Sequence, residues 1–348
     1  MPTALLLGAS GQRNPGDDAL GEAFGAALPG WRTLVATSPP AVARALVSSD
    51  ALVVAGGTVF NTLHPGAGRR PLSLLRGTVA LLGAARVLGK PRAMVGVGAG
   101  VLDSATSRRL ARALVLQSDL LVLRDEESAD VLAAAGAPTP FRVGADAAWT
   151  LLEPPPRGPR APGGPIVVAL GGPAGDGSLP AHLAAALAPL VEAGHDVRLQ
   201  PWDVSADLAL GEAVSERLPR RLPLLGAPAN LPEARRLFTE AGLVVGLRFH
   251  ALVAAAAAGT RFVAYGHEPK QAGLARRLCQ RAVGTGESSA VLTRAILDAF
   301  ERPAPSRATV EWQIEAAQAS MQLLRVLLAG GNSPAEDEIE GLPFSPAS

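Results

Sequence analysis

The chain has 348 residues, 48% of them hydrophobic, and a formal net charge of +1 at pH 7. This length can supply cores for two domains, while the near-neutral charge and the scattered arginine pairs argue against a nucleic-acid partner. A single cysteine, Cys279, excludes an internal disulfide and a cysteine metal site and suits a reducing compartment. No apolar run approaches the roughly 20 residues that span a bilayer, so we expect a soluble, cytoplasmic protein.

In chain order, the first predicted strand is residues 4–7, and a glycine-rich turn follows it at residues 8–18. We expect a helix from about Ala19. A turn of this kind between a strand and a helix leaves backbone N–H groups open to an anion or a sugar. Asp17 or Asp18 could cap the helix, and we place this structural role ahead of catalysis because aspartate before a helix is common for that reason alone.

Two further buried strands are predicted to end in glycine-rich loops. Residues 51–55 precede Gly56-Gly57-Thr58, and residues 93–97 precede Gly98-Ala99-Gly100. Asn61 lies in a long irregular stretch after the first of these loops, and such stretches are more often functional than structural. Because the carboxyl ends of parallel strands meet at one edge of a sheet, we expect these loops to form the floor of a cleft.

A fourth strand, residues 120–123, delivers Arg124 and Asp125 to the same edge. A local ion pair between these two side chains is the simplest interpretation. Apolar residues at helical spacing predict helices at residues 74–88, 107–117 and 126–135.

Residues 153–165 read EPPPRGPRAPGGP, which is typical of a semi-rigid linker. Beyond it, strands are predicted at residues 166–170, 197–200, 243–246 and 262–265, and helices at residues 182–193, 207–217, 231–240, 251–258, 291–300 and 309–328. We therefore expect an N-terminal α/β domain (1–152), the linker (153–165), a second α/β domain (166–305), a C-terminal helix (306–329) and a disordered tail (330–348). This organisation predicts an enzyme whose substrates lie in a cleft between the domains.

The segment from residue 241 to 270 carries the strongest functional signal. Its first strand ends at Gly246, so Arg248 and His250 fall where open α/β sheets bind their ligands. If the chain is still extended there, both side chains point the same way and converge with the N–H groups of the starting helix on an anion site. Lys270, in the polar loop after the next strand, would add a second cation. The structural alternative is that Arg248 caps the preceding element and His250 is an ordinary half-buried histidine.

The order and spacing of these features resemble the polysaccharide pyruvyltransferase family, from residue 4 to about residue 280. The motifs that carry the resemblance are residues 11–20, which match G-x-x-N-x-G-D-[DE]-A-[IL], Gly56-Gly57-Thr58, Gly89-Lys90-Pro91, residues 96–100, residues 124–128, Ala145-Asp146 and Gly246-x-Arg248-x-His250-Ala251-Leu252. The chain departs from the family at residues 265–270, where members commonly read Ser-Tyr-Asp-Pro-Lys and this sequence reads YGHEPK.

The resemblance implies two Rossmann-like, doubly wound α/β domains facing a central cleft, in the manner of GT-B glycosyltransferases. It implies transfer of a pyruvyl group from phosphoenolpyruvate to a sugar of a cell-surface or cell-wall polysaccharide precursor, giving a pyruvate ketal without a further cofactor. Arg248 and His250 would be catalytic, and the donor would be bound by Arg248, Phe249, His250, Lys270 and Arg124. The acceptor would be bound by Asn14, Asp17, Gly56, Gly57 and Asn61. No metal is expected, because the sequence shows no cluster of carboxylates or histidines at ligand spacing.

The family further suggests that the sugar acceptor is a membrane-anchored, lipid-linked precursor met at the cytoplasmic face, with peripheral contact to the membrane. A GT-B glycosyltransferase that uses a nucleotide sugar is the second hypothesis, and Glu268 could then contact the donor ribose. A sugar-binding or scaffold protein with a decayed site ranks last, because Arg248 and His250 are both present. The sequence gives no indication of oligomeric state or of the acceptor sugar.

Overall fold

The computed structural model describes residues 1–8, 14–62, 71–138, 141–157, 163–172, 177–330 and 343–344, with the backbone alone for residues 204–206. Three expected features therefore lie wholly or partly outside the described residues: the glycine-rich turn at 9–13, the middle of the linker at 158–162 and most of the tail beyond residue 330. Among the residues that are described, no helix is both long enough and apolar enough to cross a membrane.

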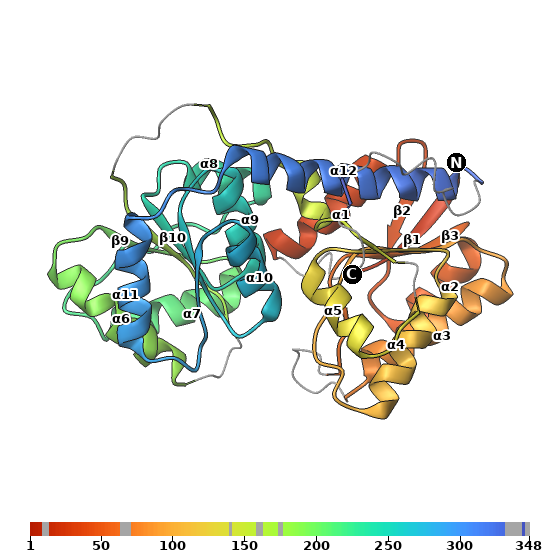
Figure 1. Cartoon of the computed structure of the whole chain (residues 1–348), viewed down its shortest axis with the longest axis horizontal. Helices are drawn as coiled ribbons and strands as arrows, with labels where there is room; N and C mark the ends of the chain where they lie inside the picture. The colour runs from red at the N-terminus through yellow and green to blue at the C-terminus, as the bar shows by residue number, and fades with distance from the viewer. Residues whose placement is uncertain are drawn as a thin grey trace. The chain divides into compact units, whose positions relative to one another are not determined.

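The chain divides into two compact units, each built around its own parallel sheet (Figure 1). Unit 1 comprises residues 1–12, 17–150 and 312–348, and unit 2 comprises residues 13–16 and 151–311. Two helices are divided between the units: Pro15 and Gly16 of the N-terminal helix and residues 307–311 of the C-terminal helix cluster with unit 2, and the rest of each helix clusters with unit 1.

The sheet of unit 1 has the strand order β2-β1-β3-β5-β6-β7, with the short strand β4 paired to the end of β5, and every pairing is parallel. The strands are β1 (Thr3–Leu7), β2 (Arg32–Val35), β3 (Ala51–Ala55), β4 (Thr58–Phe60), β5 (Arg92–Ala99), β6 (Leu120–Leu123) and β7 (Arg142–Val143). β3 is buried along its whole length and reads Ala-Leu-Val-Val-Ala, as expected of a parallel strand covered on both faces. The glycine-rich ends of β3 and β5 therefore share one edge, as predicted.

The helices of unit 1 are α1 (Pro15–Ala27), α2 (Pro39–Ser48), α3 (Ser73–Val87), α4 (Ala105–Gln117) and α5 (Glu126–Ala134), followed by a 3-10 turn at Ala147–Leu151. Sequence analysis located α3, α4 and α5 to within two residues and missed α2, β2 and β4. The C-terminal helix α12 (Arg307–Leu328) joins this unit near its end, where Arg325 donates a hydrogen bond to the carbonyl oxygen of Ala27.

The sheet of unit 2 has the order β12-β11-β10-β8-β9, again with parallel pairings throughout. Its strands are β8 (Ile166–Ala169), β9 (Val197–Gln200), β10 (Leu243–Gly246), β11 (Phe262–Tyr265) and β12 (Arg281–Val283). Its helices are α6 (Leu179–Glu192), α7 (Val204–Ser215), α8 (Leu231–Phe238), α9 (Phe249–Ala257), α10 (Pro269–Arg277) and α11 (Ser289–Phe300). The short strand β12 and the helix α10 were not predicted.

Helices cover both faces of the unit 2 sheet. Leu243 and Val245 of β10 belong to the same buried cluster as residues of α6 and α11, which lie side by side (Figure 1). Val244, between them, is fully buried on the opposite face, where α9 packs on β10 and β11 and against α8. Both units are thus doubly wound α/β domains, and the predicted fold class is confirmed.

Helix α1 begins four residues earlier than predicted. Pro15 occupies its first position, where the missing N–H costs nothing, and the side chain of Asn14 accepts a hydrogen bond (3.1 Å) from the backbone N–H of Gly16. Asp17 and Asp18 consequently lie inside the first turn. The prediction that an aspartate caps this helix is wrong, because Asn14 provides that contact.

The described start of the linker is fastened to unit 2. Arg235 of α8 donates hydrogen bonds to the carbonyl oxygens of Glu153 (3.1 Å) and Pro154 (3.2 Å), and also to Ala257 at the end of α9 (3.2 Å). Arg307 donates to the carbonyl oxygen of Pro155. The first proline residues therefore follow the surface of unit 2 instead of forming a free tether.

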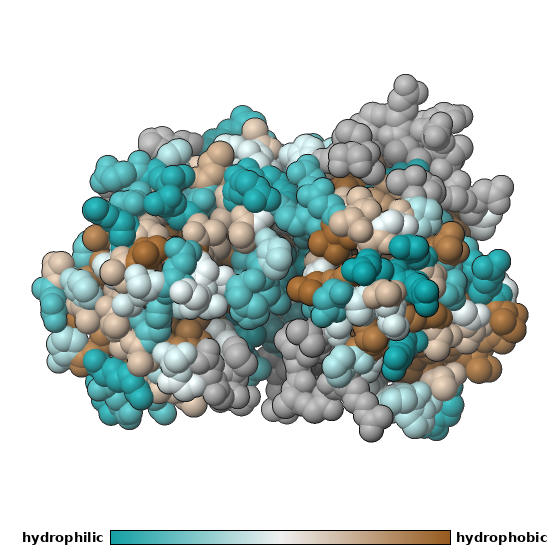
Figure 2. Space-filling model, turned by 60° about the horizontal axis from the view of Figure 1, so that its bottom comes forward, coloured by the Kyte–Doolittle hydropathy of each residue, from teal (hydrophilic) through white to brown (hydrophobic). Residues whose placement is uncertain are grey.

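Exposed large apolar side chains are dispersed over different elements, including Val47 of α2, Val87 of α3, Leu116 of α4 and Leu297 of α11. On the face shown in Figure 2, hydrophilic and hydrophobic residues are likewise interspersed. Single exposed apolar residues of this kind are normal on a globular surface.

Lys90, in the Gly89-Lys90-Pro91 motif, has a structural contact. Its ammonium group donates to three carbonyl oxygens at the end of α2, those of Leu46, Val47 (2.8 Å) and Ser49. A cation at this position satisfies carbonyl groups that have no partner within the helix and opposes the negative end of the helix dipole.

We therefore expect the substitution Lys90→Met to lower the free energy of unfolding by about 1.5 kcal/mol, the usual scale for hydrogen bonds to a charged group. Urea denaturation followed by circular dichroism measures the change. Arg109→Met, which removes an exposed cation from α4, is the matched control and should change stability by less than about 0.5 kcal/mol. Equal effects of the two substitutions would contradict a structural role for Lys90.

Candidate functional site

Arg248 stands between the end of β10 and the start of α9, and its guanidinium group is held by Asp207 of α7. Nη2 of Arg248 lies 2.9 Å from one carboxylate oxygen and 3.2 Å from the other, and Nε donates to the second oxygen at 3.3 Å. Nε also donates to the carbonyl oxygen of Leu170, just beyond β8 (3.3 Å). The pair therefore ties together the ends of β8 and β10 and the start of α7.

Asp207 is 1% exposed, and both oxygens of its carboxylate accept hydrogen bonds. Besides Arg248, it accepts hydrogen bonds from the backbone N–H groups of Trp202 (2.9 Å) and Asp203 (2.7 Å). A buried carboxylate is tolerable when it is paired and hydrogen-bonded in this way. Sequence analysis missed Asp207 as a site residue because an acid in the first turn of a helix is unremarkable.

Gly171, which follows β8, provides the space for Arg248. A Cβ atom at Gly171 would lie 2.4 Å from Cγ of Arg248, closer than any real contact. The glycine-rich strand end thus admits the arginine side chain, so the glycine need not contact a ligand to be required here.

His250 belongs to the first turn of α9, not to an extended segment. The helix begins at Phe249, so the alternation of side chains in extended chain does not apply across residues 248–250, and that part of the prediction is wrong. Whereas Arg248 contacts Asp207 and Leu170, His250 lies against Gly16 and makes an edge-to-face ring contact with Phe249 at 5.4 Å.

Lys270 lies in the first turn of α10, and its side chain reaches Phe249 at the start of α9. Its ammonium group is 2.7 Å from the carboxylate of Glu268 and 5.8 Å from the ring centroid of Phe249. Glu268 occupies the N-cap position of α10. These contacts bring Phe249 and Lys270 of the predicted donor set together and give Glu268 a defined partner.

Gln271 is a second residue that sequence reasoning missed. It is 4% exposed, and its side-chain amide donates to the carbonyl oxygen of Leu247 after β10 (2.9 Å). A Cβ atom at Gly266 would collide with the same side chain. Gln271 therefore links the loops that follow β10 and β11, but a single glutamine at the start of a helix gives no signal in the sequence.

In unit 1, Arg124 is 4% exposed and lies in a cluster of polar residues at the strand ends. It pairs with Asp125 (2.9 Å), as predicted, and also donates to the hydroxyl of Thr58 (3.0 Å), while Asp146 lies 3.9 Å away. A Cβ atom at Gly98 would overlap the guanidinium group of Arg124. The role of Arg124 in donor binding remains a prediction.

The residues predicted to bind the acceptor fall in both units. Gly56 and Gly57 have positive φ angles of 66° and 78°, which favour glycine on conformational grounds alone. Asn61 is half-buried and packs against Gly100. Asn14, immediately before α1, clusters with unit 2, and Asp17, the third residue of α1, clusters with unit 1. Their roles toward an acceptor stay predictions.

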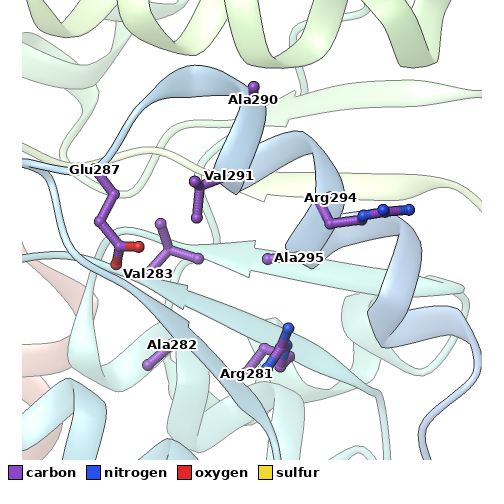
Figure 3. A pocket seen from close by; sticks show the side chains of 8 residues that line it. All are labelled: Arg281, Ala282, Val283, Glu287, Ala290, Val291, Arg294 and Ala295. Atoms are coloured by element: carbon purple, nitrogen blue, oxygen red, sulfur yellow. The ribbon is translucent and has the colours of Figure 1, made fainter.

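A pocket of about 350 Å³ lies elsewhere in unit 2 (Figure 3). It is formed by Arg281 and Val283 of β12, the intervening Ala282, the exposed Glu287, and Ala290, Val291, Arg294 and Ala295 of α11. None of the residues predicted to bind the donor lines it. We place the candidate site at the starts of α9 and α10, because the polar side chains converge there and not in this pocket.

Removing either partner of the Asp207–Arg248 ion pair should lower the free energy of unfolding. We expect Arg248→Gln to lower the free energy of unfolding by on the order of 3 kcal/mol, because it leaves the buried carboxylate of Asp207 unpaired. Asp207→Asn should cost less, because the guanidinium group that it leaves without this partner is 22% exposed. The double variant should lose at least about 1 kcal/mol less than the sum. Urea denaturation of the four proteins measures this coupling, and strictly additive losses would contradict it.

Comparison with known sequences gives one family match: a family described as polysaccharide pyruvyl transferase matches residues 13–269, well over half of the chain. The matched range includes Arg124, Arg248 and His250 and ends one residue before Lys270. A comparison with curated protein sequences gives no match.

Solved structures with the same fold are enzymes and proteins that act on or bind nucleotide sugars by their own descriptions. A putative UDP-N-acetylglucosamine 2-epimerase from Listeria monocytogenes superposes with a TM-score of 0.61 at 12% identity, covering 96% of this chain and 98% of that one. UDP-GlcNAc 2-epimerase from Neisseria meningitidis, bound to UDP-GlcNAc, gives 0.60 at 10% identity over 95% and 100%. HepE from Anabaena, in complex with UDP and glucose, gives 0.58 at 15% over 95% and 100%. At these identities the similarity establishes a GT-B-like fold of two Rossmann-like domains and nothing about substrates.

Proposed function

Since the chain belongs to the polysaccharide pyruvyl transferase family, we propose that it transfers a pyruvyl group from phosphoenolpyruvate to a sugar of a cell-surface or cell-wall polysaccharide precursor, forming a pyruvate ketal. The observation that carries this proposal is that the family match includes Arg248 and His250, while Lys270 comes to the start of the same helix through its contact with Phe249.

The donor has two anionic groups, a phosphate and a carboxylate, and therefore requires cations and free backbone N–H groups. Lys270 offers a point charge, and the N–H groups in the first turn of α9 lie at the positive end of its helix dipole. Arg248 contributes its third nitrogen, Nη1, since Asp207 and Leu170 engage Nε and Nη2. Arg124 remains the proposed contribution of unit 1 to donor binding.

Ketal formation begins with a proton delivered to the CH₂ carbon of the enol. The neighbouring carbon becomes oxocarbenium-like and is attacked by one hydroxyl group of the sugar, which loses its proton. A second hydroxyl group of the sugar then forms the second C–O bond as the bond from this carbon to the phosphate oxygen breaks. The proton of that hydroxyl group leaves with the phosphate, so the products are the ketal and inorganic phosphate. His250 is the proposed acid, because an imidazole ring can donate a proton from one nitrogen and accept a proton at the other.

Asn14, Asp17, Gly56, Gly57 and Asn61 remain the proposed acceptor contacts. The family relationship supports an acceptor met at the inner face of the membrane as a lipid-linked precursor, with the protein binding there peripherally.

The test is phosphate release from phosphoenolpyruvate in the presence of acceptors that contain mannose, N-acetylmannosamine or galactose. Release should depend on both the donor and one class of acceptor. Release without any acceptor would indicate a phosphatase. No release with any acceptor, together with thermal stabilisation by a nucleotide sugar, would overturn the proposal in favour of a glycosyltransferase.

Lys270→Met should raise the KM for phosphoenolpyruvate by about 10-fold to 100-fold, the equivalent of losing one charge-assisted hydrogen bond to the donor. Substitution of Arg248 is a poorer test, since it leaves the buried carboxylate of Asp207 unpaired. The matched control is Arg276→Met, which removes an exposed cation from the other end of α10 and should leave KM within about 2-fold. Equal KM values for parent and Lys270→Met would remove Lys270 from the donor site.

A further inference from the structure

The backbone at the start of α1 lies directly against His250, within unit 2. A Cβ atom built on Gly16 would be 2.3 Å from Nδ1 of His250 and 2.6 Å from both its Cβ and Cγ. Gly16 is buried. Any side chain at this position would therefore occupy the space that the imidazole now fills.

Space, and not backbone conformation, requires a glycine here. Gly16 is the second residue of α1 and is absent from the glycines with positive φ, so alanine could adopt its conformation. Alanine would even favour the helix by roughly 1 kcal/mol. Gly16 therefore lowers the stability of the helix, but it allows the close approach of His250.

The clash would not be relieved by rotating the ring alone. One of the overlapping atoms is Cβ of His250, which is fixed to the backbone of α9 and does not move when the imidazole turns. A methyl group at Gly16 must therefore shift the imidazole and also separate the two backbone segments.

We infer that the start of α1, from Asn14 to Gly16, is a positioning element for His250. The Nδ1 edge of the imidazole rests on the backbone at Gly16, and Asn14 holds that backbone through its hydrogen bond to the Gly16 N–H. Because Nδ1 faces this backbone, we assign the proton transfer to the other ring nitrogen, Nε2, which is buried in the structure. The inference rests on the proposed function for the proton-transfer role, but the contact itself does not.

The experiment compares two Gly→Ala substitutions in the same helix. Gly16→Ala introduces the clash, whereas Gly25→Ala places a methyl group on an exposed position where the nearest atom, Oγ1 of Thr33, is 3.9 Å away. Gly16→Ala should lower kcat for acceptor-dependent phosphate release by about 100-fold, the scale of a catalytic group misplaced by about 1 Å, with the KM for phosphoenolpyruvate within about 3-fold. Gly25→Ala should match the parent in both constants.

A second readout is independent of activity. The Hε1 signal of His250, observed by NMR with ¹³C-labelled histidine and assigned through His250→Gln, should shift in Gly16→Ala and stay in place in Gly25→Ala. If the parent releases no phosphate but the signal shifts, the contact stands and the proposed function fails. If the parent is active and Gly16→Ala changes neither kcat nor the His250 signal, the positioning role is overturned.

If Gly16→Ala destabilises the fold, a double-variant cycle tests whether the loss of stability comes from the clash with His250. In a His250→Gly background, which removes the three atoms nearest to the added methyl group, Gly16→Ala should no longer lower the melting temperature. An equal loss in both backgrounds would place the clash elsewhere and would contradict the inference.

Discussion

The bidentate contact between Asp207 and Arg248 is the constraint on which the candidate site in unit 2 depends. Asp207 is almost fully buried, so its charge requires a partner, and the guanidinium group supplies one while also reaching the carbonyl oxygen of Leu170. One ion pair thereby fixes the ends of two neighbouring strands and the start of α7. Arg248 immediately precedes α9, so the pair holds the residue from which that helix, with His250 in its first turn, begins.

Three glycines at strand ends and one at the start of α1 leave room for neighbouring polar side chains because they have no side chain of their own. Gly171 admits Arg248, Gly98 admits Arg124, Gly266 admits Gln271 and Gly16 admits His250. None of these four has a positive φ, so each position is explained by the neighbouring side chain and not by the turn. Glycine-rich strand ends are commonly interpreted as ligand-binding loops. In this protein they also leave space for polar side chains from neighbouring elements.

The sequence was sufficient for the alternation of strands and helices, the parallel sheets and the position of Arg248 and His250 at the end of β10, because buried apolar runs and glycine punctuation are local signals. It did not predict the features that depend on contacts between residues far apart in the chain. Asp207 is 41 residues from Arg248, so nothing nearby marks it as a partner. The start of α1 was misplaced because the glycines and Pro15 suggested a loop, whereas proline is favoured at a first helical position. His250 was given an extended backbone because residues 248–250 carry no cap signal.

In the proposed reaction, phosphoenolpyruvate gains a proton at its CH₂ carbon, the neighbouring carbon bonds to two oxygens of the sugar, and phosphate is released. Reaction in D₂O tests it most directly, because the proton added to the CH₂ carbon then comes from solvent. We predict a product whose ketal carbon bears a CH₂D group, formed in equal amount to the phosphate released. Phosphate accompanied by free pyruvate and an unchanged acceptor would contradict the account.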